Sequence, residues 1–377
     1  MRGNWAKTGL GEIVEVLDRM RQPITSAERA KRLGGVPYFG ANGQTGWINE
    51  SIFNEELVLL GEDAIDFLSP LARKAYLISG PSWVNNHVHV LRPIKGKTRP
   101  YFLTELLNMV DYSQFVSFGT RSKLTQGAMM DISVRLPPLA DQDRIVDILV
   151  SVDTYIAALQ RKAANARAAR YAVLHELLTA GGDDWIETTL GEIAEYINGY
   201  PFKPEDLGEE GTPVIRIKQL LDSNEACDKT LIKAPNRCVL QSGDIVFSWS
   251  GTLAVRVWDR ERAYLNQHLF RVVEKEGVLH KWLPFVIEHS IRDLSEMTHG
   301  TTMKHVTKQT LLPHAVQLPP LSEQKRIVEI VASMDDVVSA TEKAVSSAHE
   351  LRSGLLSGLL SGDHEIPESY DRLIGAA

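Results

Sequence analysis

The sequence predicts a mixed α/β (α+β) protein of two similar domains, joined and followed by long helices that pair as an antiparallel coiled coil. Three observations support this prediction. Signals in the first half of the chain return in the second half at a nearly constant offset. Each copy ends in Leu-Pro-Pro-Leu, which is followed by apolar residues at three- and four-residue steps. Short runs within the copies alternate between apolar and polar residues, as strands do.

The repeat consists of four signals in the same order. Their offsets lie between 180 and 182 residues, for Trp5 and Trp185, His87 and His268, Gly119 and Gly300, and Leu136 and Leu318. A period this long indicates a repeated domain with its connector, because solenoid repeats are only about 20–50 residues long. Between the signals the copies differ. This favours two domains with one task and different targets, and the alternative is plain drift after duplication.

The first domain is predicted at residues 1–136, with a short helix from Tyr101 to Val110. A helical segment follows at residues 137–182. Two prolines open it, because proline fixes its own φ and has no N–H to donate, and two glycines close it. A helix over residues 141–179 would be about 58 Å long. An isolated helix of this length needs a partner along its side.

The second domain is predicted at residues 183–317 and the second helical segment at 318–362, with a tail at 363–377. Strands are predicted at Thr212–Ile217, at 243–249 and at Val255–Trp258, and a helix at Trp282–Ile291. The last helix has the same apolar spacing as the first. We expect its end, Leu355–Gly362, to fray.

The two long helices are expected to pair antiparallel and to fix the separation of the domains. Their equal length and the domain between them motivate this hypothesis. The alternative is that each helix packs only on its own domain.

Composition is typical of a globular protein, with 44% apolar and 24% charged residues. No apolar run approaches the roughly 18 residues of a membrane span, and no signal segment is seen, so we expect a cytoplasmic protein. The net charge is −7, and residues 1–136 alone carry +3. Any affinity for DNA must therefore come from a local basic face or from partner subunits.

Common catalytic and metal motifs are not found. The sequence has no phosphate-binding loop, no dinucleotide-binding glycine pattern and no His-Glu-x-x-His pair. The two Pro-Pro pairs follow leucine, so neither is the Asn/Asp-Pro-Pro-aromatic tetrapeptide expected of an adenine methyltransferase. Cys227 and Cys238 fit no zinc motif and are expected to be reduced thiols. We therefore expect no metal site and no catalysis by the chain alone.

Polar residues near the repeat signals suit contact with DNA. Asn and Gln can bind adenine, Arg and Lys can bind guanine, and small polar residues can hold phosphates. The candidates are Asn85, Asn86, Gly119, Thr120, Arg121, Lys123, Arg216, Lys218, Gln219, Ser248, Ser250, Thr252, Asn266, Gln267, Gly300, Thr301, Thr302 and Lys304.

Several of these signals also have structural explanations. His87 and His268 are interpreted as buried residues that bond to the backbone. Trp249 is interpreted as a core residue rather than a platform on which bases stack. The Gly-Thr pairs at Gly119 and Gly300 fit plain turns as well as phosphate contacts.

With these features, the chain resembles the specificity (S) subunit of type I restriction–modification systems. The resemblance covers nearly the whole chain, and the repeated Pro-Pro-Leu-x-x-Gln-x-x-Ile is its most specific part. The segments that carry it are Leu190–Ile193 after Trp185, residues 243–251, Trp83–His87, Gly300–Lys304 and Leu318–Val328. The first half departs more: Leu60–Asp63 replaces the Gly-Asp-Ile-Val start of a strand, and Gly119–Lys123 is a variant.

The resemblance implies that each domain is a target-recognition domain for one half of a bipartite double-stranded DNA site. It implies that the helices set the gap and dock two methyltransferase subunits, through residues such as Leu139, Ile145, Leu149, Val152, Leu321, Ile327, Val331 and Met334. These partners would bind S-adenosylmethionine and methylate adenine after flipping the base. Restriction subunits would add ATP- and Mg-dependent translocation. The alternative is a non-catalytic scaffold of two protein-binding modules on a coiled coil.

Overall fold

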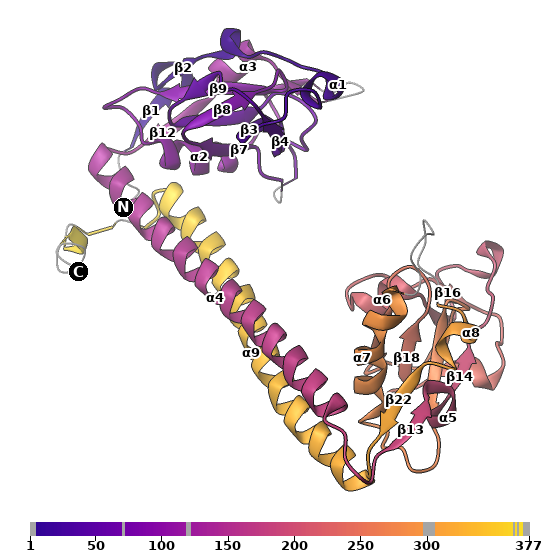
Figure 1. The fold of residues 1–377 in the computed structure, drawn as a ribbon. Helices are drawn as coiled ribbons and strands as arrows, with labels where there is room; N and C mark the ends of the chain where they lie inside the picture. Colours follow the sequence, from indigo (N-terminus) through magenta and orange to yellow (C-terminus); the bar gives the residue numbers. More distant parts are fainter. Residues whose placement is uncertain are drawn as a thin grey trace. The chain divides into compact units, whose positions relative to one another are not determined.

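The computed structural model describes residues 5–69, 72–117, 122–296, 306–364, 366–367 and 369–371 (Figure 1). The chain forms two compact units. Unit 1 contains Met1–Gln160 and Ala344–Ala377, and unit 2 contains Arg161–Lys343. Each unit holds one strand-rich domain, called a module below, together with part of each long helix.

The module of unit 1 has two four-stranded sheets, ordered β2-β9-β6-β7 and β4-β3-β8-β5, and two two-stranded pairs, β1-β12 and β10-β11. The strands are β1 (Ala6–Gly9), β2 (Val14–Val16), β3 (Val36–Gly40), β4 (Gly43–Ile48), β5 (Phe53–Asn54), β6 (Leu57–Gly61), β7 (Ala75–Ile78), β8 (Pro81–Val84), β9 (Val88–Pro93), β10 (Val116–Ser117), β11 (Lys123–Leu124) and β12 (Ser133–Leu136). The helices are α1 (Ser26–Arg29), α2 (Pro100–Met109) and α3 (Gln126–Met130), with 3-10 turns at Leu10–Glu12 and Asp18–Met20.

The module of unit 2 has the sheets β14-β21-β18-β19 and β16-β15-β20-β17, and the pair β13-β22. Its strands are β13 (Ile186–Thr189), β14 (Ala194–Asn198), β15 (Thr212–Ile215), β16 (Lys229–Thr230), β17 (Val239–Leu240), β18 (Ile245–Ser248), β19 (Ala254–Val257), β20 (Ala263–Leu265), β21 (Leu269–Glu274) and β22 (Ala315–Leu318). Its helices are α5 (Leu190–Ile193), α6 (Ile217–Leu221), α7 (Leu283–Glu296) and α8 (Lys308–Leu311), with 3-10 turns at Pro204–Asp206 and Asn236–Cys238.

The two modules share one topology, except for the pair β10-β11, which has no counterpart among the described residues of unit 2. In each, a four-stranded antiparallel sheet lies beside a second sheet whose central pair is parallel: β3 with β8 in unit 1, and β15 with β20 in unit 2. Parallel pairs are rarer than antiparallel ones, so finding one at the same place twice is a specific match. The duplication predicted from the repeat offset is therefore confirmed in the fold.

Strand pairing also corrects one detail of the sequence alignment. Gly61 pairs with Val88 at the end of β6, and Ser248 pairs with Leu269 at the end of β18, so Gly61 and Ser248 are equivalent. Strand β6 therefore begins at Leu57, not at the Leu60–Asp63 segment that was expected to replace its start. That expectation was wrong because Leu60 and Gly61 are the last two residues of the strand.

The other short elements occur close to their predicted places. Helices α2 and α7 match the predictions at residues 101–110 and 282–291, and β18 and β19 match those at 243–249 and 255–258. The strand predicted at residues 212–217 ends at Ile215, and helix α6 begins at Ile217.

The two long helices are α4 (Leu139–Thr179), with 41 residues, and α9 (Leu321–Leu360), with 40 residues. In unit 2, Arg170 of α4 forms an ion pair with Asp335 of α9, and Arg167 Nη1 lies 2.5 Å from Glu342 Oε1. A later residue of α4 thus faces an earlier residue of α9. The helices pair antiparallel, as predicted, and Figure 1 shows them side by side.

Unit 1 contains contacts between α4 and α9 at the equivalent positions of the repeat. Arg352 of α9 forms an ion pair with Asp153 of α4, and Gln160 Nε2 lies 3.3 Å from His349 Nε2. Arg352 and Asp153 stand 182 residues from Arg170 and Asp335, the offset that relates the two Leu-Pro-Pro-Leu segments. The duplicated helices are therefore self-complementary: each carries an Asp and an Arg that bind the Arg and Asp of the other.

The end of α9 was expected to fray, and this expectation was wrong. The helix continues to Leu360, and Leu359 and Leu360 are buried in the hydrophobic core of unit 1. The same core contains Ile145 and Leu149 of α4. Burial of these side chains holds the last turn in place. In the described part of the chain, no helix is long and apolar enough to cross a membrane.

Candidate DNA interface

In each module, three segments distant in sequence meet where one inner strand of the antiparallel sheet ends. This strand is β6 in unit 1 and β18 in unit 2. In unit 1, the N–H of Glu62 donates to the carbonyl of His87 at 3.1 Å, and the N–H of Leu124 donates to the carbonyl of Glu62 at 2.9 Å. In unit 2, the N–H of Trp249 donates to His268 O at 3.5 Å, and the N–H of Val306 donates to Trp249 O at 2.9 Å.

These equivalent bonds define one group of residues in each module, and we call the two groups the first edge and the second edge. The first edge comprises Arg21, Glu62, Asp63, Asn85, Asn86, His87 and Lys123, and the second edge comprises Trp249, Ser250, Asn266, Gln267 and His268. The structure thus brings the candidates Asn85, Asn86 and Lys123 together at one edge, and Ser250, Asn266 and Gln267 at the other. Ser248 lies directly beside the second edge.

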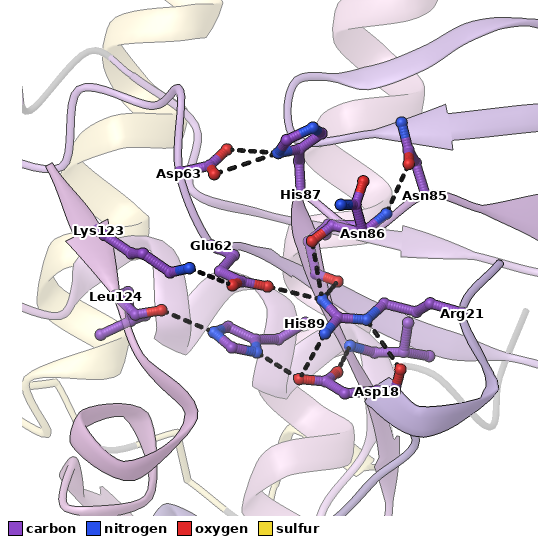
Figure 2. Close-up of polar contacts among 12 residues, drawn as sticks. Asp18, Arg21, Glu62, Asp63, Asn85, Asn86, His87, His89, Lys123 and Leu124 are labelled. Carbon is purple, nitrogen blue, oxygen red and sulfur yellow. Dashed lines mark hydrogen bonds and ion pairs between the residues drawn. The ribbon is translucent and has the colours of Figure 1, made fainter. Parts of the chain in front are cut away.

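Charged groups dominate the first edge (Figure 2). Arg21 Nη1 donates to Glu62 Oε2 at 2.7 Å and to the carbonyls of Asn86 at 3.2 Å and Val88 at 2.8 Å. On the other side of the same carboxylate, Lys123 Nζ lies 3.0 Å from Glu62 Oε1. Burial acts to raise the pKa of Glu62, but the hydrogen bonds from Arg21 and Lys123 outweigh it and hold this pKa below its ordinary value.

The first edge also shows that the interpretation of His87 as a buried residue was wrong. His87 is exposed, and its Nδ1 lies 2.9 Å from Asp63 Oδ1. The buried histidine is His89, which is 1% exposed. Its ring nitrogens lie 2.6 Å from Asp18 Oδ2 and 2.9 Å from the carbonyl of Leu124 (Figure 2).

Asn86 is the most accessible amide of the first edge. Its side chain is exposed, whereas that of Asn85 is half-buried and accepts a hydrogen bond from the N–H of Asn86 at 2.7 Å. Residues Arg21, Glu62 and His89 were missed at the sequence level. Trp249 and Phe270 occupy the positions equivalent to Glu62 and His89, so the repeat gave no signal for these residues. Only the pairing of β6 with β9 and the bridge between Asp63 and Lys123 bring their neighbourhood together.

Aromatic groups replace these charges at the second edge. Trp249 is half-buried, and its ring lies 5.7 Å from that of Phe270, in a stacked arrangement, and 5.6 Å from that of His268. Its Nε1 donates to the carbonyl of Gln267 at 3.2 Å. Trp249 is thus neither a full core residue nor a free platform. His268 is half-buried, and its Nδ1 has no hydrogen-bond partner among the described residues, so the interpretation of a backbone-bonded histidine was wrong here as well.

Three polar candidates near the second edge are buried and serve the fold. Ser248 Oγ donates to the carbonyl of Ser250 at 3.3 Å, and Asn266 Oδ1 accepts from the N–H of His268 at 3.4 Å. Ser248, Ser250 and Asn266 are at most 7% exposed. Gln267, in contrast, is exposed, as is Thr252 in the turn between β18 and β19. Gln267 and Thr252 are therefore the accessible side chains among these candidates.

Arg216, Lys218 and Gln219 lie at the start of α6, next to the second edge. The N–H of Asn266 donates to the carbonyl of Ile215, which directly precedes Arg216, at 3.0 Å. Arg216 is half-exposed and lies 3.0 Å from Asp228. Gln219 is buried and donates to the carbonyl of Ala226 at 2.6 Å, whereas Lys218 is exposed. Lys218 is therefore the accessible cation of this group.

The remaining candidates, Gly119, Thr120, Arg121, Gly300, Thr301, Thr302 and Lys304, lie outside the described residues. Within the described part of the chain, no group of three or more His, Cys, Asp or Glu residues could hold a metal ion.

The spacer-helix candidates divide by burial. Ile145, Leu149, Ile327 and Val331 are at most 2% exposed and pack into the cores of their own units. Leu139, Val152 and Met334 are half-buried, and Leu321 is 49% exposed. The four buried residues hold the helices on the modules, so a partner would have to bind other positions.

Comparison with known proteins gives one consistent family. A family model described as the type I restriction modification DNA specificity domain matches residues 2–166 and again 182–348. The chain is 26% identical over 366 residues to a putative type I restriction enzyme specificity subunit of Haemophilus influenzae, covering 90% of both chains. It is 25% identical over 187 residues to the EcoBI specificity subunit of Escherichia coli, covering 48% of this chain and 39% of that protein.

Two solved structures share the fold. One comes from work on complex assembly and conformational transition of the type I restriction–modification system, with a TM-score of 0.61, 18% identity, and coverage of 96% of this chain and 99% of that one. The other is the specificity subunit from M. genitalium, with a TM-score of 0.55, 14% identity and coverage of 97% of both chains.

Proposed function

The chain belongs to the family of the type I restriction modification DNA specificity domain, of which it carries two copies, and from this membership we propose that each module reads one half of a bipartite DNA site. The observation that carries the proposal is the contrast between the two edges. The same backbone frame presents the charged cluster Arg21–Glu62–Lys123 in one module and the aromatic cluster of Trp249 in the other. One frame with two different surfaces suits two different half-sites.

Exposed side chains at the edges supply the contacts. The amides of Asn86 and Gln267 can bind adenine in the major groove, and Lys218 and Lys123 can bind phosphate or guanine. Lys123 can reach DNA by giving up its ion pair with Glu62, which keeps its bonds to Arg21. Because the net charge of the chain is −7, partner subunits supply much of the phosphate neutralisation.

The long helices dock two methyltransferase subunits and set the gap between the half-sites. Their exposed apolar residues, Val150 and Tyr155 on α4 and Val337 and Leu351 on α9, suit such docking because a solvated apolar side chain favours burial. The chain itself is non-catalytic and binds no cofactor. S-adenosylmethionine, ATP and Mg belong to the methyltransferase and restriction subunits, and the complex acts in the cytoplasm.

Coexpression with a methyltransferase subunit, followed by methylome sequencing, tests the proposal. We expect adenine methylation in a split motif with one fixed gap. Asn86→Ala is expected to relax the specificity of one half-site only, and Gln267→Ala that of the other, since each lies on a separate module. A complex that assembles and leaves the DNA unmodified contradicts the proposal.

A scaffold of two protein-binding modules is the second candidate function. The net charge of −5 over residues 183–320 favours it, because an acidic module repels DNA. DNA binding by the assembled complex distinguishes the two: the scaffold predicts no sequence-dependent retention of DNA fragments at any salt concentration.

A further inference from the structure

The glutamine of the repeated Pro-Pro-Leu-x-x-Gln motif is completely buried in both copies. Gln142 lies in the first turn of α4 and Gln324 in the first turn of α9, and both are 0% exposed. Neither residue reaches a module edge. A buried amide that makes no hydrogen bonds is strongly unfavourable, so the partners of these two side chains indicate what they do.

Gln142 uses its amide to join α4 to the module of unit 1. Its Oε1 accepts from the N–H of Arg99 at 2.9 Å, and its Nε2 donates to the carbonyl of Lys97 at 3.1 Å. Both residues lie in the turn between β9 and α2. The Nε2 also donates to the carbonyl of Pro137, just before the helix, at 2.9 Å. The acceptor and both donor hydrogens of the amide are thus in use.

Gln324 makes the same three bonds in unit 2. Its Oε1 accepts from the N–H of Leu279 at 2.6 Å, and its Nε2 donates to the carbonyls of Gly277 at 2.9 Å and Pro319 at 2.8 Å. Gly277 and Leu279 lie in the turn between β21 and α7. We call this set of three bonds the glutamine contact. All its partners are backbone groups, so the two turns can differ in sequence while the contact persists.

Hydrogen bonds of this kind restrict orientation in a way that the neighbouring apolar contacts do not. Ile145 and Leu149 bury apolar surface, and that stabilisation has little directional preference. The glutamine contact depends on the angle at each donor and acceptor. The nearby ion pair between Arg99 and Asp143 lacks an equivalent in unit 2, where Leu279 and Lys325 stand at these positions. The glutamine contact therefore recurs in both modules at the start of the helix that follows each module. Ion pairs of Arg352 with Glu105 and of Arg170 with Glu288 also recur, but they reach each module from the other long helix.

We propose that the two glutamine contacts fix the orientation of each module on its own long helix and thereby restrict the complex to a single gap between half-sites. This inference rests on the proposed function. Changing the gap by one base pair moves a half-site by about 3.4 Å and rotates it by about 35° around the DNA axis. A module that has only apolar contacts with the start of its own helix could turn to follow such a site, whereas a module with three directional bonds there resists the rotation.

The test uses Gln142→Leu and Gln324→Leu, each in the complete complex with its methyltransferase subunits. Leucine keeps the apolar part of the side chain and removes all three bonds. The substrate is a plasmid library in which the gap between the half-sites varies by single base pairs. We expect the ratio of methylation at neighbouring gaps to methylation at the native gap to rise at least about tenfold, which corresponds to a loss of about 1.4 kcal/mol of discrimination. The half-site sequences are expected to stay the same.

Two control variants distinguish this effect from a nonspecific loss of folding or of methylation activity. Asn165→Leu removes an exposed amide elsewhere on α4, and Asp143→Lys removes the ion pair beside the contact and introduces the residue found at the equivalent position, Lys325. Neither should change the gap ratio. Partial unfolding lowers methylation at all gaps alike, so it leaves the ratio unchanged. Where a leucine variant does not assemble, Gln142→Asn and Gln324→Asn, which shorten the amide by one methylene, are measured in the same way.

The outcomes distinguish this inference from the proposed function. If the unmodified complex methylates no split motif, the proposed function fails. If it methylates a split motif with one gap, and the variants keep that single gap at reduced total methylation, the role of the glutamine contact in gap selection is overturned.

Discussion

Equivalent buried positions in the two modules are occupied by residues of different chemistry. His89 in β9 and Phe270 in β21 occupy matching places in the strand register, and both are buried. The histidine needs Asp18 and the carbonyl of Leu124 as partners, whereas the phenylalanine stacks on Phe247 and Trp249. One module therefore uses a buried polar network where the other uses an aromatic cluster.

Replacing His89 with the residue of the other copy is expected to destabilise the protein. His89→Phe leaves the Leu124 carbonyl without its ring partner and removes one contact of Asp18. Leaving such buried groups unsatisfied costs about 1–3 kcal/mol each, so we expect a loss of about 2–4 kcal/mol, measured by urea denaturation of the full chain. His87→Ala is the matched control, since this exposed pair with Asp63 should contribute about 1 kcal/mol or less. Equal losses for both variants would contradict the assignment.

The pairing of α4 and α9 depends on arginines whose carboxylate partners differ in burial. Arg352 contacts Asp153 and also Glu105, which is 3% exposed at the side chain. Arg170 contacts Asp335 and Glu288, which are 44% and 36% exposed. Removing an arginine is more costly where it leaves a carboxylate buried with one partner fewer.

We therefore expect Arg352→Ala to be more destabilising than Arg170→Ala. The expected losses are about 2–4 kcal/mol and about 1–2 kcal/mol, because hydrogen bonds to charged groups contribute about 1.5–3 kcal/mol and exposure reduces this. Arg167→Ala serves as the control, with an expected loss below about 0.5 kcal/mol, since its pair with Glu342 is largely exposed. Denaturant midpoints of the three variants check the order, and a reversed order would show that burial of Glu105 is not the cause.

The contact between α4 and α7 is expected to weaken in mild acid. His289 Nε2 lies 2.9 Å from His175 Nδ1, with Asp293, Glu288 and His314 also nearby. Burial, and then the charge of His175, lowers the pKa of His289 below its ordinary value of 6.5. Burial also lowers the pKa of His314.

Because the folded protein holds these pKa values below those of the unfolded chain, the unfolded chain takes up protons first as the pH falls. The contribution of these two histidines to the free energy of unfolding is therefore fully present above pH ~6.5 and decreases progressively below it. We expect the melting temperature to fall between pH 7.5 and pH 5.5, and His289→Gln to reduce that fall. His349→Gln, on the exposed face of α9, should leave it unchanged. A melting temperature that does not vary over this range would argue against a histidine-linked contact.

The matched pairing of the helices determines how the proposed spacing function can be tested in the whole molecule. Deleting residues 163–169 of α4 together with 337–343 of α9 removes Arg167 and Glu342, which pair with each other, and keeps Arg170 and Asp335. Seven residues are nearly two helical turns and about 10 Å. This length corresponds to about three base pairs of DNA.

We expect methylome sequencing of the matched deletion to show both half-sites unchanged and one new, shorter gap. Its length depends on the translation of about 10 Å together with the rotation of about 35° per base pair. Deleting only residues 163–169 shifts the helices out of register and should abolish methylation of any split motif. An unchanged gap after the matched deletion would reject the helices as the spacing element.

The sequence by itself determined the features that depend on local pattern. Apolar residues at helical spacing, two prolines and two glycines are enough to predict α4, because helix formation depends on neighbours within four residues. The constant repeat offset predicted the duplicated modules and supported the family resemblance. Strand β6 gave no such signal, because all five of its residues are buried and the apolar–polar alternation of a half-exposed strand is absent.

The tertiary structure alone decided which residues form the two edges and what the motif glutamines do. Arg21, Glu62 and Lys123 come from three distant segments, and only strand pairing places them in contact. Ser248 and Asn266 were plausible DNA contacts by residue type, but folding buries them. Two of the three bonds of Gln142 go to backbone groups more than 40 residues away, which have no side-chain signature in the sequence. Long-range contacts of this kind depend on chain topology, which local sequence patterns do not encode.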